Sequence, residues 1–203
     1  MSSAREETAW FEQLYAAAEA GDAAVPWFRG GPNPFLEQWV RERGLHGDGR
    51  RALVIGSALG DDAELLAARG FAVTAFDIAP TAIDGARRRF PDSSVDYRVA
   101  DLLDLPAEWR AAFDLVAEAI TVQSLPLSLR DRAIDAIAST VAPGGTLVVV
   151  SGIHAGDGPR EGPPWALTRE ELDRFARTLR PVEVGVARIG ENARWRGEYT
   201  RPA

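Results

Sequence analysis

The sequence predicts an α/β fold in which helices cover a mainly parallel sheet. From about residue 50 onward, short apolar runs alternate with helical patterns, which is the signature of repeated βα units. Two final apolar runs follow one another closely and are typical of an antiparallel pair of strands. The chain has 203 residues, 46% of them hydrophobic and 26% charged, which suits one domain with a sizeable core.

The expected helices and strands follow from the spacing at which apolar residues recur and from glycine or proline at the ends of each element. Strands are expected at 52–56, 71–77, 95–100, 113–118, 146–151, 182–189 and 193–200. Helices are expected at 6–19, 35–43, 61–69, 80–90, 129–141 and from Thr168 to about 179. The Ala-Pro-Gly-Gly of 142–145 is expected to stop the helix before the fifth strand, and 152–166 to form a long loop.

Residues 1–48 are expected to form an N-terminal helical cap, and residues 49–203 the main part of a single structural domain. Trp10, Phe11, Leu14 and Tyr15 lie on one side of the first helix, and 26–34 is an aromatic-containing loop. Such a layer either covers a sheet edge or acts as a lid over a ligand.

Composition excludes several functions. The net charge of -7 disfavours a nucleic acid partner, because a phosphate backbone would be repelled. The chain has no cysteine and only two distant histidines, His46 and His154, so no metal site is expected. Every basic residue is arginine, which excludes a catalytic lysine. The charged N-terminus and the lack of a long apolar run predict a cytoplasmic protein without a membrane partner.

Three consecutive strands end in residues suited to a nucleotide. Gly56 to Gly60 is a turn before a helix start, although it is also compatible with a plain tight connection. Asp77 follows 21 positions after Gly56, a spacing that suits a carboxylate on ribose hydroxyls, and its alternative role is a helix cap. Asp101 ends the third strand, where it is suited to an adenine amino group or to a simple turn. Because Asp61 and Asp62 open the helix, a cationic sulfonium is favoured over a pyrophosphate.

These residues resemble those of class I S-adenosylmethionine-dependent methyltransferases, and more narrowly the thiopurine, thiol, halide and tellurite branch. The resemblance rests on Pro26-Trp27, on residues 52–78, on FDLVAEAITVQSLP at 113–126, on APGG and on GPPWALTREEL at 162–172. It implies a Rossmann-like seven-stranded sheet whose last strand is antiparallel. Ala58 departs from the family, which often has Gly-Cys-Gly at 56–58.

The cofactor expected from this resemblance is S-adenosyl-L-methionine, with S-adenosyl-L-homocysteine as product. Its expected binding residues are Trp27, Gly56, Ser57, Ala58, Gly60, Asp62, Asp77, Ile78, Asp101, Leu102, Glu118 and Ala119. Methyl transfer is an in-line displacement that depends mainly on alignment. Trp27 could hold the sulfonium by cation–π attraction or serve as packing.

The acceptor is expected to be a small molecule of thiol, halide or hydroxyl type, bound by a monomer or homodimer. Its expected contacts are Tyr15, Phe28, Thr121 and Trp165, all equally explicable as packing. A hydroxyl would need a base, for which His154 and Glu118 are the candidates. The alternatives are a nicotinamide-dependent oxidoreductase and a non-catalytic nucleotide-binding protein with the same fold.

Overall fold

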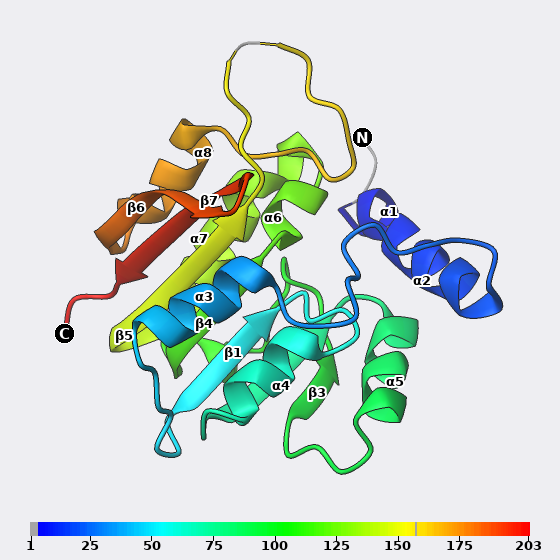
Figure 1. Cartoon of the computed structure of the whole chain (residues 1–203), viewed down its shortest axis with the longest axis horizontal. Coiled ribbons are helices and arrows are strands. Elements are labelled where there is room, and N and C mark those ends of the chain that lie inside the picture. Colours follow the sequence, from blue (N-terminus) through cyan, green and yellow to red (C-terminus); the bar gives the residue numbers. More distant parts are fainter. Residues whose placement is uncertain (1–3, 157) are drawn as a thin grey trace.

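The structure, a computed structural model, describes residues 4–156 and 158–203 and contains one seven-stranded sheet (Figure 1). The strands are β1 (Arg51–Ile55), β2 (Ala72–Asp77), β3 (Asp96–Val99), β4 (Phe113–Ala119), β5 (Val141–Ser151), β6 (Arg180–Ile189) and β7 (Asn192–Thr200). Their order is β3-β2-β1-β4-β5-β7-β6, with β1 to β5 parallel and β7 antiparallel to both neighbours. The predicted Rossmann-like fold with its antiparallel last strand is confirmed.

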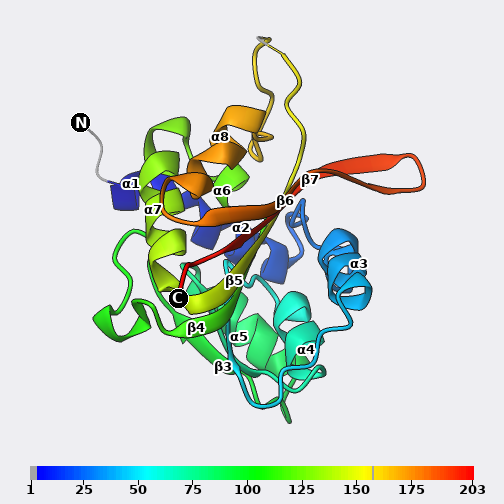
Figure 2. The same cartoon turned by 90° about the vertical axis from the view of Figure 1, so that its left-hand side faces the viewer.

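Helices cover both faces of the sheet, as Figure 2 shows. The α-helices are α1 (Ala4–Thr8), α2 (Trp10–Ala20), α3 (Pro34–Glu42), α4 (Asp61–Ala67), α5 (Pro80–Arg89), α6 (Thr121–Ser124), α7 (Arg130–Thr140) and α8 (Arg169–Asp173). Successive residues of a strand point to opposite faces, so Leu53 packs in the core cluster that contains α7 and α8, and Val54 in the cluster that contains α3, α4 and α5. The side chains of both clusters are buried, and their packing holds the ends of the strands in place.

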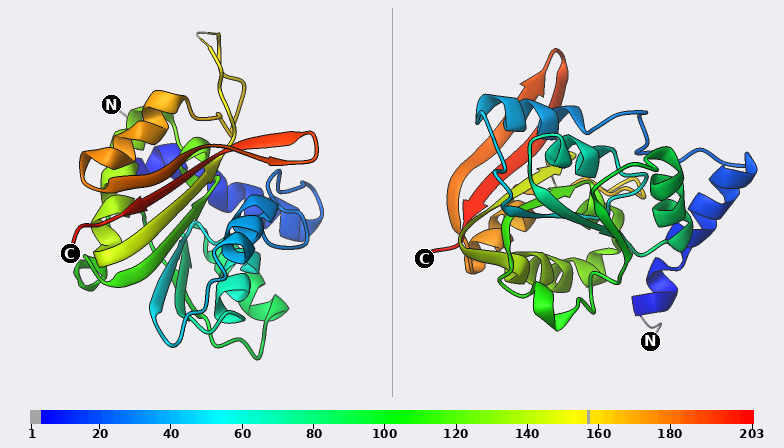
Figure 3. Two further views of the ribbon diagram at one scale, coloured as in Figure 1. Left: turned by 60° about the vertical axis from the view of Figure 1, so that its left-hand side comes forward. Right: turned by 90° about the horizontal axis from the view of Figure 1, so that it is seen from below.

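The cap of residues 4–48 divides into two parts with different positions (Figure 3). Helix α2 lies beside α5, where the Thr81 hydroxyl donates a hydrogen bond of 2.5 Å to Glu12, and α1 precedes α2. Helix α3 is a core helix, since Trp39 and Val40 are buried against the sheet. Only α1 and α2 are therefore placed as a cover, whereas α3 is part of the main domain's packing.

Three expected boundaries are wrong. The 6–19 helix is interrupted, with α1 ending at Thr8 and α2 beginning at Trp10. The 168–179 helix is short, because α8 gives way to a 3-10 helix at Arg174–Arg177. The Pro-Gly-Gly segment is a bulged start of β5, not a stop outside it. Its backbone is held by the chain after β7, since Gly144 N donates to Arg201 O at 2.9 Å.

Among the residues that the structure describes, none of the helices has the length and apolar character needed to cross a membrane. Within the same residues, no three histidine or acidic side chains gather where they could hold a metal ion.

Candidate functional site

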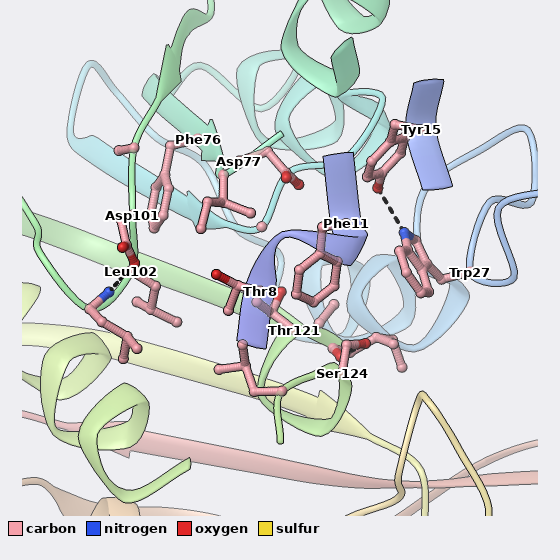
Figure 4. A pocket seen from close by; sticks show the side chains of 17 residues that line it. Thr8, Phe11, Tyr15, Trp27, Phe76, Asp77, Asp101, Leu102, Thr121 and Ser124 are labelled. Carbon is pink, nitrogen blue, oxygen red and sulfur yellow. Dashed lines mark hydrogen bonds between the residues drawn. The ribbon is translucent and has the colours of Figure 1, made fainter. Parts of the chain in front are cut away.

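Two cavities lie where β1, β2 and β4 end, on either side of the turn that follows β1. The inner cavity is narrow, about 60 Å³, and its lining includes Phe11, Phe76, Asp77, Asp101 and Leu102 (Figure 4). The outer cavity is larger, about 420 Å³, and lies between the 26–35 segment, the start of α4 and the β6–β7 hairpin. Trp27, Gly56, Ala119 and Ile120 line both cavities, and we call these four residues the junction. The cavities are thus two compartments of one site.

The turn after β1 has the backbone that a nucleotide loop needs. Gly56, Ala58 and Gly60 have φ values of 59°, 48° and 95°, all in the left-handed region. A Cβ on Gly56 would collide with the Thr121 side chain, whose hydroxyl donates to Ile55 O at 2.9 Å. Ala58 adopts this conformation although it has a Cβ, at a cost of roughly 1–2 kcal/mol. The glycine expected from the family would be unstrained there.

Asp77 ties the turn to the end of β2. Its carboxylate accepts hydrogen bonds of 3.0 Å from the backbone N–H groups of Ala58 and Ala79. The side chain is 6% exposed, and burial raises its pKa from 3.8 to about 6. The carboxylate lines the inner cavity and forms no ion pair with an arginine of the described residues, so its remaining lone pairs are available to ligand hydroxyls. The ligand role and the cap role of Asp77 are compatible.

The other walls of the inner cavity come from β3, β2 and α2. Asp101 lines it and uses one carboxylate oxygen to accept from Leu103 N at 2.8 Å. Ile78 and Leu102 also line the cavity and supply apolar surface. Figure 4 shows Phe11 projecting into the space between Asp77 and Thr121.

Trp27 closes the inner cavity from the side of α2. Its ring nitrogen donates to the Tyr15 hydroxyl at 2.8 Å, and its ring meets Phe11 edge-on at 6.1 Å between centroids. Burial raises the pKa of Tyr15 far above its usual range, so this hydroxyl stays protonated. At about 60 Å³ the inner cavity is below the roughly 300 Å³ at which small-molecule pockets begin. A nucleoside therefore requires Phe11 and α2 to move outward.

The junction contains a strained residue. Ile120 has a φ of 72°, which is unusual for a β-branched side chain, and its N–H donates to Val150 O at 2.9 Å. Strained backbone concentrates at functional sites. The strain therefore agrees with a functional junction between the cavities.

Glu118 lies next to the junction but lines neither cavity. It is 1% exposed, one carboxylate oxygen accepts from Val122 N at 2.9 Å, and the other has no hydrogen-bond partner among the described residues. Burial raises its pKa from 4.5 to about 7. This position supports a role in holding the α6 turn.

The outer cavity contains polar groups that suit an amino acid tail. The Ser57 hydroxyl is buried without a hydrogen-bond partner among the described residues. Asp62 accepts from Asn33 N at 2.6 Å, and burial raises its pKa to about 6. Asp61 also lines the cavity, but Arg89 neutralises it with bonds of 2.7 and 2.8 Å.

The sequence-predicted residues divide into those that line a cavity and those that do not. Tyr15 and Thr121 line the inner cavity and Phe28 lines the outer one, where it is 42% exposed. Gly60, His154 and Trp165 line neither. Trp165 supports the site through its backbone, because its N–H donates to Gln123 O at 2.7 Å.

Sequence reasoning missed three features of the site, namely Ile120 at the junction and Arg29 and Arg194 in the outer cavity. It also missed Arg130, which is fully buried and donates to Glu171 at 2.9 Å and to Trp165 O at 2.6 Å. No local pattern marks these residues, except that an arginine on the apolar face of a helix needs a buried partner.

Comparison with known proteins agrees with this geometry. Residues 52–145 match the model of the methyltransferase domain family. The ubiquinone biosynthesis O-methyltransferase of Xanthomonas campestris pv. campestris is 41% identical over 101 residues, which cover 49% of this chain and 41% of that protein. The chain therefore spans less than half the length of the curated relatives that it matches first.

Solved structures share the whole fold. N-methyltransferase NodS from Bradyrhizobium japonicum WM9, in complex with S-adenosyl-l-homocysteine, has a TM-score of 0.71 and 22% identity, covering 95% of this chain and 100% of that one. The [4+2]-cyclase SpnF has a TM-score of 0.75 and 18% identity, covering 99% and 97%. At these identities the likeness shows the fold alone, and the cyclase illustrates that the fold does not fix the reaction.

Residues 52–145 thus match a methyltransferase domain, the named relatives are methyltransferases, and the solved structures show the shared fold. These comparisons do not assign the chain to the narrower branch of thiopurine, thiol, halide and tellurite methyltransferases.

Proposed function

We propose that this protein transfers a methyl group from S-adenosylmethionine to a hydroxyl of a small molecule. The observation that carries the proposal is the pair of cavities that share Trp27, Gly56, Ala119 and Ile120, with buried Asp77 in the inner one. A two-compartment site of this kind suits a cofactor that reacts at its middle.

The residues present fit the cofactor. In this proposal the adenosine occupies the inner cavity after α2 has moved, with its ribose hydroxyls on Asp77 and its base between Ile78, Asp101 and Leu102. The methionine tail lies in the outer cavity, where the free Ser57 hydroxyl and the Asp62 carboxylate suit its carboxylate and ammonium groups. When bound, the cofactor supplies an electrophilic methyl on a sulfonium.

The chain's own contribution to the reaction is alignment and exclusion of water. Trp27 lies at the junction, where its ring can stabilise a positive charge by about 0.5–2 kcal/mol. Its bond to Tyr15 fixes the ring, since the indole N–H is already used. His154 lines neither cavity, so the proposal assigns it no contact with the acceptor.

A hydroxyl acceptor is favoured by the O-methyltransferase name of the relatives. The described lining of the outer cavity contains no histidine that could act as its base. Without such a base, the acceptor should carry an acidic hydroxyl that loses its proton to water or to a carboxylate. The inner cavity offers mostly apolar walls, and the outer one offers room for the acceptor beside the methionine tail.

Turnover with three matched acceptors tests the proposal. The full chain would be incubated with methyl-labelled S-adenosylmethionine and catechol, thiophenol or iodide, and release of S-adenosylhomocysteine measured. We expect methylation of catechol to be fastest. Methylation of thiophenol or iodide alone would overturn the hydroxyl assignment, and absence of release with all three would overturn the proposed activity on simple acceptors.

A further inference from the structure

Arg194 stands where the hairpin of β6 and β7 reaches over the outer cavity. Strand β7 pairs with β5 only from Trp195 onward, so residues 187–194 lie beyond the last rung with β5, as the projecting hairpin in Figure 2 shows. Ile189, Asn192 and Arg194 from this hairpin line the outer cavity. These residues line the outer cavity and not the inner one, to which the proposed function assigns the adenosine.

The charge of Arg194 is unusual among its neighbours on β7. Residues 194, 196 and 198 share one face of the strand, which packs on α3. Arg196 is paired with Glu42 at 2.9 Å, and Glu198 is paired with Arg43. Among the described residues Arg194 has no carboxylate partner; its guanidinium donates a hydrogen bond of 2.7 Å to Ala193 O and lies 5.8 Å from the centre of the Phe35 ring. Its other N–H donors are left for a ligand.

The rest of the cavity does not cancel this charge. Arg89 neutralises Asp61 through two hydrogen bonds, and in the proposed function the Asp62 carboxylate holds the ammonium group of the cofactor. Arg29 adds a second arginine to the lining and also lacks a carboxylate partner among the described residues. The whole chain has a net charge of -7, so a cavity with two unpaired arginines differs in sign from its surroundings.

We propose that the methyl acceptor carries a carboxylate or a similar anionic group and that Arg194 binds it. This inference rests on the proposed function and names the substrate class of the same site. A guanidinium matches a carboxylate with two parallel hydrogen bonds, and the half-buried position of Arg194 screens the pair less than open water would. Held at this end, a short acceptor would present its nucleophile toward the junction at Trp27 and Ile120.

Binding of matched acids and neutral molecules tests the proposal. The full chain, saturated with S-adenosylhomocysteine, would be titrated by calorimetry with 3,4-dihydroxybenzoate and with catechol, which carry the same hydroxyls with and without a carboxylate. We expect the acid to bind at least tenfold more tightly, and Arg194→Gln to remove that preference. Arg188→Gln, on the same hairpin but exposed and outside the cavity lining, should keep it.

Three outcomes overturn the proposal. One is equal or undetectable binding of the acid and its neutral partner by the wild-type protein. A second is an acid preference that survives in Arg194→Gln. A third is a loss of S-adenosylhomocysteine affinity in Arg194→Gln without a change in acid preference, which would assign Arg194 to the methionine carboxylate. Failure of the wild-type protein to bind S-adenosylhomocysteine is a separate result, which would instead contradict the proposed function.

Discussion

Replacing Asp77 with asparagine should stabilise the ligand-free protein and weaken cofactor binding. The two effects have opposite signs because the buried carboxylate is costly without a ligand and useful with one. Its oxygens accept from Ala58 N and Ala79 N at 3.0 Å, and the side chain is 6% exposed. Asparagine is close in shape but uncharged, so the substitution removes the charge with little change in packing.

The stability change follows from the pKa of Asp77, which burial raises from 3.8 to about 6. Between about pH 4 and pH 6 the folded protein binds more protons at this group than the unfolded chain, so its stability falls as the pH rises through that window. A difference of about two in pKa corresponds to about 3 kcal/mol. After subtracting about 1 kcal/mol for a weakened backbone hydrogen bond, we expect Asp77→Asn to gain about 2 kcal/mol at pH 8 and nothing at pH 4.

The affinity change follows from the proposed ribose contact. Loss of hydrogen bonds to a charged group costs about 1.5–3 kcal/mol, which predicts a 10- to 150-fold weaker binding of S-adenosylhomocysteine. Urea unfolding at pH 4 and pH 8 measures the first effect, and calorimetry measures the second. Asp84→Asn, an exposed acid on α5, is the control and should change neither. A variant that is destabilised at pH 8, or that binds S-adenosylhomocysteine as the wild type does, would refute the reasoning.

Three further substitutions test the framework of the site by urea unfolding. Arg130→Met should destabilise the protein by about 3 kcal/mol, because Arg130 is fully buried on Glu171; a loss below about 1 kcal/mol would contradict this. Ala58→Gly should stabilise it by about 0.5–1 kcal/mol, because Ala58 has a φ of 48°, whereas Ala24→Gly in an exposed loop should not. Burial raises the pKa of Glu118 from 4.5 to about 7, so the stability of the wild-type protein should fall as the pH rises through that range. Relative to the wild type, Glu118→Gln should become more stable by up to about 3 kcal/mol between pH 5 and pH 9. A stability difference between the two proteins that does not change with pH would contradict the buried charge.

The elements that the sequence predicted well are those fixed by local patterns. Strands β1 to β4 and the acids at the ends of β2 and β3 follow from apolar runs of characteristic length and from the residue after each run. The start of β5 was not predictable in this way, because Gly144 is held by Arg201, 57 positions away, and a glycine pair is typical of a turn.

The site was predictable on its cofactor side more than on its acceptor side. Asp77 and Gly56 belong to one βα unit, so their spacing carries the information. The outer cavity combines the loop around Arg29 with the hairpin around Arg194, which meet only through tertiary packing. His154 was an expected base because it follows β5, yet it lines neither cavity. Whether it acts on the acceptor stays a prediction.

The most direct test is calorimetric titration of the full chain with S-adenosylhomocysteine and, separately, with NAD. Both ligands carry adenosine, but only the first has an amino acid tail to fill the outer cavity around Ser57 and Asp62 in place of a pyrophosphate. We predict that S-adenosylhomocysteine binds at least tenfold more tightly than NAD. Tighter binding of NAD, or no binding of S-adenosylhomocysteine, would contradict the assignment of the two cavities.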